Sequence, residues 1–195
     1  MHGPLAPDDE QEWLRRAQAL RDPAAFRKLV ERHHGRVRAV LLRLTHGNRA
    51  LADELAQEAL WKAWNALPAF RADARFGTWL HRIAYHEFLQ AERRTVPARG
   101  RDDAWRIEAT PEPASDADND SLRIDLQRAL DALKPAERAA ILYCYHGELS
   151  HAEAAQVLGM PLGTVKSLVL RGAEKLRHSL AAWQPPRVTK EQDHG

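Results

Sequence analysis

Apolar residues recur every three or four positions along most of this chain, the spacing that places them on one face of an α-helix. Stretches in which apolar and polar residues alternate are too short to predict a β-strand. Alanine, leucine, arginine and glutamate, which favour helices, dominate the periodic segments. The predicted helices are 9–20, 23–45, 50–67, 76–94, 121–133, 135–146, 150–157 and 161–180. The pattern therefore predicts an all-α fold.

The periodic pattern stops between residues 95 and 120, where prolines and acidic residues gather. Such a composition buries little apolar surface and is typical of a flexible tether. We therefore expect two small helical domains, 9–95 and 121–182, joined by a flexible acidic linker at 96–120. The tail at 183–195 is expected to be disordered.

Composition excludes several classes of protein. Apolar residues make up 44% of the 195 residues, enough for a core. A formal net charge of +2 is too small to indicate a nucleic-acid partner, so local clusters of charge must decide. No segment approaches the ~18 apolar residues of a membrane span, and the acidic N-terminus is unlike a signal peptide. With Cys144 as its single cysteine, expected to be buried, the chain is predicted to be cytoplasmic, without membrane insertion.

The segment from 150 to 180 has the features of a helix-turn-helix. Ser150 and Glu153 form a capping box at the start of the first helix. Gly159 supplies the left-handed residue that ends this helix, and Pro161 suits the first turn of the next. Two helices joined by so short a link have helix-turn-helix geometry.

The second of these helices carries polar and basic residues opposite its apolar stripe. A helix about 10–12 Å wide fits the major groove of DNA. Arg171 is suited to a guanine edge or a phosphate, whereas Lys166 and Lys175 are suited to phosphates. An ordinary helical hairpin with a solvated basic face also explains the pattern. The candidate DNA-binding residues are His151, Thr164, Lys166, Ser167, Leu170, Arg171 and Lys175.

Three stretches of this half are distinctive together: KPAERAAILYCYHGELS, LSHAEAAQVLG and PLGTVKS. They resemble region 4 of the extracytoplasmic-function group of RNA polymerase sigma factors, which belong to the sigma-70 family. The resemblance implies that the helix at 161–180 reads the −35 promoter element. After TVKS this chain has Leu168, Val169 and Leu170, where the family usually has arginine, leucine, and histidine or an aromatic residue. We expect Leu168 to join the core and the −35 preference to differ, with the fold unchanged.

The first half holds a second block, ALADELAQEALWKAWNAL followed by PAFRADARFGTWLHRIAYHEFLQAERR. It resembles regions 2.2 to 2.4 of the same family, so the resemblance covers most of the chain. It implies binding to RNA polymerase core, with the β′ clamp and the β flap as docking sites. A solvated face with a Glu58–Lys62 pair is the simpler explanation of the helix at 50–67. The residues implied to bind polymerase are Asp53, Glu54, Gln57, Glu58 and Trp61.

The helix at 76–94 and the loop before it are implied to capture and melt the −10 element. Basic and aromatic residues together suit single-stranded DNA, because charge follows the backbone and rings stack on bases. The loop at 70–75 resembles the family loop that captures a flipped base. His81 and His86 replace residues typical of the family, so the −10 preference is expected to be unusual. The implied DNA-binding residues are Phe70, Arg71, Asp73, Ala74, His81, Arg82, His86, Gln90, Arg93 and Arg94.

Two other classes of function explain less of the sequence. An enzyme is disfavoured because no HExxH metal motif or phosphate loop occurs, and no cofactor is expected. A stand-alone helix-turn-helix repressor is the alternative, but it has no use for the acidic face at 53–58. The sequence therefore favours a non-catalytic transcription initiation factor that binds polymerase core and promoter DNA. The resemblance adds an anti-sigma factor as a partner.

Overall fold

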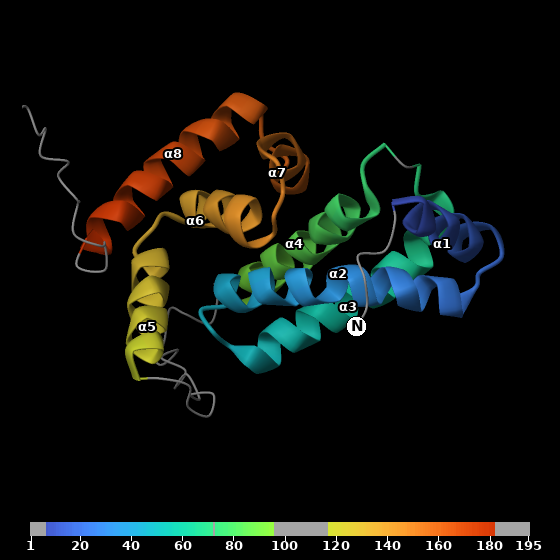
Figure 1. Cartoon of the computed structure of the whole chain (residues 1–195), viewed down its shortest axis with the longest axis horizontal. Helices are drawn as coiled ribbons and strands as arrows, with labels where there is room; N and C mark the ends of the chain where they lie inside the picture. Colours follow the sequence, from blue (N-terminus) through green and yellow to red (C-terminus); the bar gives the residue numbers. More distant parts are fainter. Residues whose placement is uncertain (1–6, 72, 96–116, 182–195) are drawn as a thin grey trace, which may run out of the picture.

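The structure is a computed structural model that describes residues 7–71, 73–95 and 117–181. Secondary structure within these ranges is helical throughout, which confirms the predicted all-α fold (Figure 1). The first half contains α1 (Pro7–Ala19), α2 (Pro23–Leu44), α3 (Arg49–Ala66), the short η1 (Leu67–Ala69) and α4 (Phe76–Thr95). The second half contains α5 (Ala117–Asp131), α6 (Pro135–Ile141), the π-helical turn η2 (Leu142–His146), α7 (His151–Leu158) and α8 (Leu162–Ser179).

The predicted helix boundaries agree with these elements to within a few residues, apart from two differences. Helix α5 begins at Ala117, inside the segment predicted as linker. The predicted helix at 135–146 changes from α-helical to π-helical geometry at Leu142. The rest of the predicted linker and the tail at 183–195 lie outside the described residues, and the domain boundaries stay a prediction.

Side-chain caps fix where the helices of the first half begin. Asp22 accepts hydrogen bonds from the backbone nitrogens of Ala24 and Ala25 at the start of α2. Asn48 accepts one from Leu51 N at the start of α3. These caps pair backbone N–H groups that have no partner within the helix.

Most of the buried face of α3 is made of alanine. Leu51, Leu60 and Trp64 of this helix are only half-buried. The face packed against α2 and α4 consists mainly of alanine, because small side chains allow helix axes to approach closely. Its buried residues are Ala52, Leu55, Ala56, Ala59 and Ala63.

The predicted helix-turn-helix is confirmed. Ser150 Oγ accepts a hydrogen bond from Glu153 N, and the Glu153 carboxylate accepts one from Ser150 N. Gly159 has φ 64°, the left-handed conformation expected of a helix-ending glycine. Val165 and Val169 face the core, as does Leu168, in agreement with its predicted place.

The two halves pack directly against each other. Helix α7 lies against α4, and η2 lies against α2 (Figure 1). Tyr143 of η2 is fully buried, with its ring edge-on to those of His81 and Tyr85 on α4. Polar contacts also join the halves, including Arg43 Nη1 to Gln127 Oε1 at 3.0 Å. The described residues of both halves therefore share one continuous core.

Candidate nucleic-acid and polymerase interfaces

The outer face of α8 is open to solvent. Its corner with α7 directs this face away from the core, and Leu170 keeps 70% of its surface exposed. The Ser167 hydroxyl donates a hydrogen bond to the Gly163 carbonyl oxygen at 2.9 Å, within the same helix. The structure places all seven candidate −35 residues on the exposed surface: His151, Thr164, Lys166, Ser167, Leu170, Arg171 and Lys175.

A buried carboxylate on α6 supports this face from behind. Glu137 is 3% exposed, and its Oε2 accepts a hydrogen bond from Lys175 Nζ at 2.6 Å. Its Oε1 lies 3.7 Å from Arg171 Nε. The Lys175 hydrogen bond lowers the pKa of Glu137, so the carboxylate is ionised at neutral pH. Sequence reasoning missed this residue, whose only signal is an acidic group in the first turn of the helix that KPAER begins.

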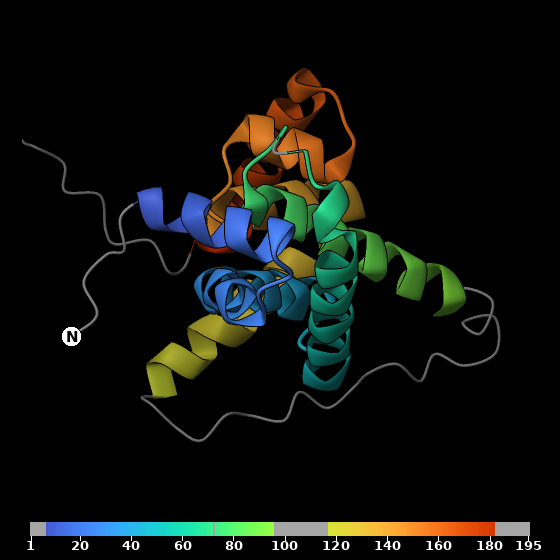
Figure 2. The same cartoon turned by 90° about the vertical axis from the view of Figure 1, so that its right-hand side faces the viewer.

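The candidate −10 residues divide by exposure. Helix α4 and the loop before it carry an exposed set. The last turn of α4, with Arg93 and Arg94, projects from the bundle (Figure 2). Ala74 and Gln90 are half-buried. The exposed residues are Arg71, Asp73, Arg82, His86, Arg93 and Arg94.

Phe70 belongs to the core. Its ring is 8% exposed and lies 4.8 Å from that of Trp79, centroid to centroid. Its carbonyl oxygen accepts a hydrogen bond from Gln18 Nε2 at 2.7 Å. These contacts fix the start of the loop at 70–75, and the ring itself is covered.

His81, one of the residues implied to bind DNA, is also buried rather than exposed. It is 3% exposed because Tyr143, from the other half of the chain, covers its ring. Burial lowers its pKa to about 4, helped by the nearby charges of His33 and Arg36. His81 is therefore neutral at physiological pH.

The candidate polymerase-binding face of α3 combines carboxylates with an exposed indole. Trp61 is 62% exposed, although tryptophan is usually well covered. The Asp53 carboxylate accepts hydrogen bonds from the Arg38 guanidinium, which lower its pKa. Glu54 and Gln57 are exposed, and Asp53 and Glu58 are half-buried. The structure thus places the five predicted residues along one accessible stretch of α3.

The predicted Glu58–Lys62 pair forms, but it is not the shortest contact of that lysine. Lys62 Nζ lies 3.6 Å from Glu58 Oε1 and 2.6 Å from Glu87 Oε2 on α4. The hydrogen bond to Glu87 raises the pKa of Lys62. Lys62 therefore joins α3 to α4. Its longer contact with Glu58 neutralises the Glu58 carboxylate only in part, so this carboxylate still adds negative charge to the outer face of α3.

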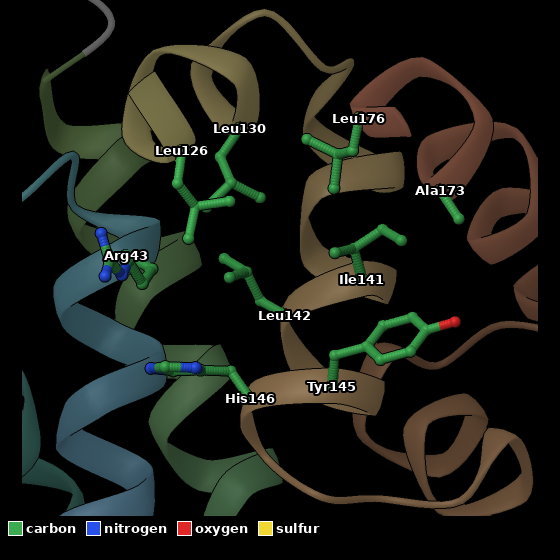
Figure 3. A pocket seen from close by; sticks show the side chains of 9 residues that line it. All are labelled: Arg43, Leu126, Leu130, Ile141, Leu142, Tyr145, His146, Ala173 and Leu176. Atoms are coloured by element: carbon green, nitrogen blue, oxygen red, sulfur yellow. The ribbon is translucent and has the colours of Figure 1, made fainter. Parts of the chain in front are cut away.

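A pocket of about 290 Å³ lies where α5, η2 and α8 meet α2. In Figure 3 the side chains of Leu126, Leu130 and Leu142 point toward one another across it. Arg43 and His146 form its polar side, and partial burial together with the charge of Arg43 lowers the pKa of His146. The pocket is therefore an apolar space whose imidazole adds no positive charge at neutral pH.

Comparisons with known proteins match both halves of the chain. The model of Sigma-70 region 2 matches residues 29–96, and that of Sigma-70, region 4 matches 123–176. The ECF RNA polymerase sigma factor SigE of Mycolicibacterium smegmatis is 38% identical over 191 residues, covering 91% of this chain and 71% of that protein. The ECF RNA polymerase sigma-E factor of Escherichia coli K12 is 30% identical over 166 residues, covering 80% and 86%.

Solved structures agree. The sigma factor RpoE in complex with the anti-sigma factor NepR from Bartonella quintana has a TM-score of 0.69 and 26% identity, covering 82% of this chain and 98% of that one. CnrH in complex with the cytosolic domain of CnrY has a TM-score of 0.67 and 25% identity, covering 91% and 100%. With regions 2 and 4 present in order on this fold, the chain belongs to the extracytoplasmic-function group of the sigma-70 family of sigma factors.

Proposed function

We propose that this sigma factor directs RNA polymerase core to promoters through three surfaces, with α8 reading the −35 element. The observation that carries the proposal is the exposed basic face of α8 beyond the Gly159 corner. Arg171 contacts a base edge or a phosphate, while Lys166 and Lys175 hold phosphates. Leu170 is exposed and apolar, which suits contact with a thymine methyl group.

The −10 element is assigned to α4 and the loop before it. Arg82, His86 and the Arg93–Arg94 pair supply the exposed cationic and aromatic groups that suit melted DNA. Phe70 and His81 are left out of the contacting set because both side chains are buried. In this arrangement they support the surface from within.

Polymerase core is assigned to the acidic and aromatic face of α3. Exposed carboxylates complement a basic partner, and an exposed tryptophan is a common anchor of protein interfaces. Glu54 and Trp61 are exposed residues of this face. A stand-alone repressor would have no use for it.

An anti-sigma factor is proposed as a further partner. The similar RpoE structure contains one, which supports the same kind of control here. Within the described part of the chain, no helix is both long enough and apolar enough to cross a membrane. We place the protein in the cytoplasm, where polymerase core is found.

The test is run-off transcription by the purified chain with bacterial core polymerase on a pool of genomic promoter fragments. Specific transcripts are expected, and Glu54→Lys/Glu58→Lys should abolish them by repelling the basic partner. The matched control is Glu31→Lys, an exposed charge reversal on α2. DNA binding by the chain alone, without core binding or transcripts, would favour the repressor.

Arg171→Ala tests the assignment of α8. Loss of one base-reading arginine is expected to weaken discrimination of the −35 sequence about five- to hundredfold. The affinity for core polymerase should be unchanged, because the substitution leaves the proposed polymerase-binding face of α3 intact. The measurement compares transcription from a selected promoter with core affinity, and an equal loss of both would count against the assignment.

A further inference from the structure

We infer that Glu137 is a positioning residue for −35 recognition: its buried carboxylate orients Arg171 and Lys175 on α8. The inference rests on the proposed role of α8. Glu137 lies on α6, outside the helix-turn-helix, and no contact of its own with DNA is needed.

The contact depends on a close approach of α6 to α8. Gly172 follows Arg171 in the sequence, and it lies on the buried side of α8. A Cβ at this position would lie 2.8 Å from Ile141 Cγ1 and 3.6 Å from Glu137 Cβ. The absence of a side chain therefore lets α8 pack closely enough for both cations to reach the carboxylate.

Glu137 is buried, whereas the two cations that contact it, Arg171 and Lys175, are exposed. The Glu137 side chain is 4% exposed, whereas those of Arg171 and Lys175 are 57% and 47% exposed. A ligand on the outer face can touch the two cations but hardly the carboxylate. Any influence of Glu137 on DNA must therefore pass through Arg171 and Lys175.

The carboxylate is held firmly enough to act as a fixed anchor. Besides the hydrogen bond from Lys175, it accepts one from Lys134 N at 3.3 Å, as part of the first turn of α6. An arginine and a lysine on a free helix surface lose considerable side-chain entropy when they bind. Anchoring them beforehand reduces that loss. Glu137 Oε1 lies 3.7 Å from Arg171 Nε, and the Arg171 side chain is 57% exposed, so a guanine on the outer face can reach the guanidinium.

A positioning role and a purely electrostatic role of Glu137 predict different effects of its neutralisation on DNA binding. If Glu137 acted only as a negative charge near DNA, its neutralisation would strengthen binding to every sequence. If it positions Arg171, its neutralisation weakens the preference for the cognate −35 sequence. The ratio of affinities for cognate and scrambled −35 elements distinguishes these effects.

The experiment uses holoenzyme assembled from core polymerase and the full chain. The DNA is a promoter selected by run-off transcription, with its −35 element intact or scrambled. The variants are Glu137→Gln, Arg171→Ala and the double variant. We expect Glu137→Gln to lower the affinity ratio several-fold, up to about tenfold. In the Arg171→Ala background the same change should have little further effect on the ratio, since the base-reading residue that it positions is gone. Lys175 remains, but it is assigned to phosphates, which the intact and scrambled DNAs share.

An unchanged ratio for Glu137→Gln, or equal losses with and without Arg171, would overturn the inference. If Arg171→Ala itself left the ratio unchanged, the proposed role of α8 would fail as well, so the two failures are distinguishable. Should Glu137→Gln fail to fold, Glu137→Asp keeps the charge on a side chain one methylene shorter. It should lower the ratio in the same direction, and an unchanged ratio there would also overturn the inference.

Discussion

At the scale of single residues, burial gives several side chains a different role from the one their chemical type indicates. His81 is a histidine in a segment expected to melt DNA, yet it is covered by Tyr143 and is neutral. Glu137 is an ordinary acidic residue in the sequence, but it is buried and bound to two cations. Cys144 was predicted to be buried and is half-buried, with a thiol pKa raised by its surroundings.

The burial of His81 predicts a pH dependence of stability. Its pKa is about 4 in the folded chain, against an ordinary value of 6.5. Between these pH values the unfolded chain therefore binds more protons than the folded chain. As a result, the free energy of unfolding decreases as pH falls from 6.5 toward 4. The loss approaches roughly 3 kcal/mol at the low end, from 1.36 kcal/mol per pH unit.

Urea unfolding at several pH values measures this loss. His81→Gln should flatten the pH dependence across that window relative to the unchanged chain. His86→Gln, at an exposed position on the same helix, is the matched control and should change it little. Identical pH profiles for His81→Gln and the unchanged chain would contradict the assignment.

At the scale of elements, local signals determine where helices end, whereas contacts with neighbouring helices determine which face of each helix is buried. The capping box at Ser150 and the left-handed Gly159 need only nearby residues, so they were predictable. The alanine face of α3 was not, because alanine is compatible with both surface and core. Its burial depends on how closely α2 and α4 approach.

Glycine in α8 gives a prediction at this scale. Alanine usually stabilises a helix relative to glycine by about 1 kcal/mol. At Gly172, however, the new Cβ would lie 2.8 Å from buried Ile141, and such overpacking typically costs about 1–3 kcal/mol. Gly172→Ala should therefore lower the melting temperature. Gly163→Ala, where nothing lies within 4 Å of the added Cβ, should leave it equal or higher.

Thermal unfolding followed by circular dichroism tests the pair. The two variants make the same chemical change in the same helix, so helix propensity alone predicts the same sign for both. A rise in melting temperature for both would mean that α6 and α8 are not packed as closely as the structure has them.

At the scale of the whole molecule, regions 2 and 4 share one core across the contact of α4 with α7 and of α2 with η2. Tyr143 is the central side chain of this contact, fully buried against His81 and Tyr85. Regions that share a core are expected to unfold together. We predict a single calorimetric transition for the unchanged chain.

Tyr143→Ala should divide that transition into two, because it removes the largest buried side chain of the contact. Loss of a large aromatic side chain from a core typically costs about 3–5 kcal/mol. Leu170→Ala, a large-to-small change at an exposed position, is the control and should keep one transition. Two transitions in the unchanged chain would show that the regions unfold independently.

The sequence by itself determined the helices, the corner before α8, the polar and basic face of α8 and the family of the chain. Each of these depends on residues close together in the chain or on a motif of fixed spacing. Only the tertiary structure decided that Tyr143 covers His81, that alanines form the core face of α3 and that Glu137 holds Lys175. Helical periodicity shows which residues share a face, but the partner that covers the face comes from a distant segment, and its charge and size determine what the covered residues do.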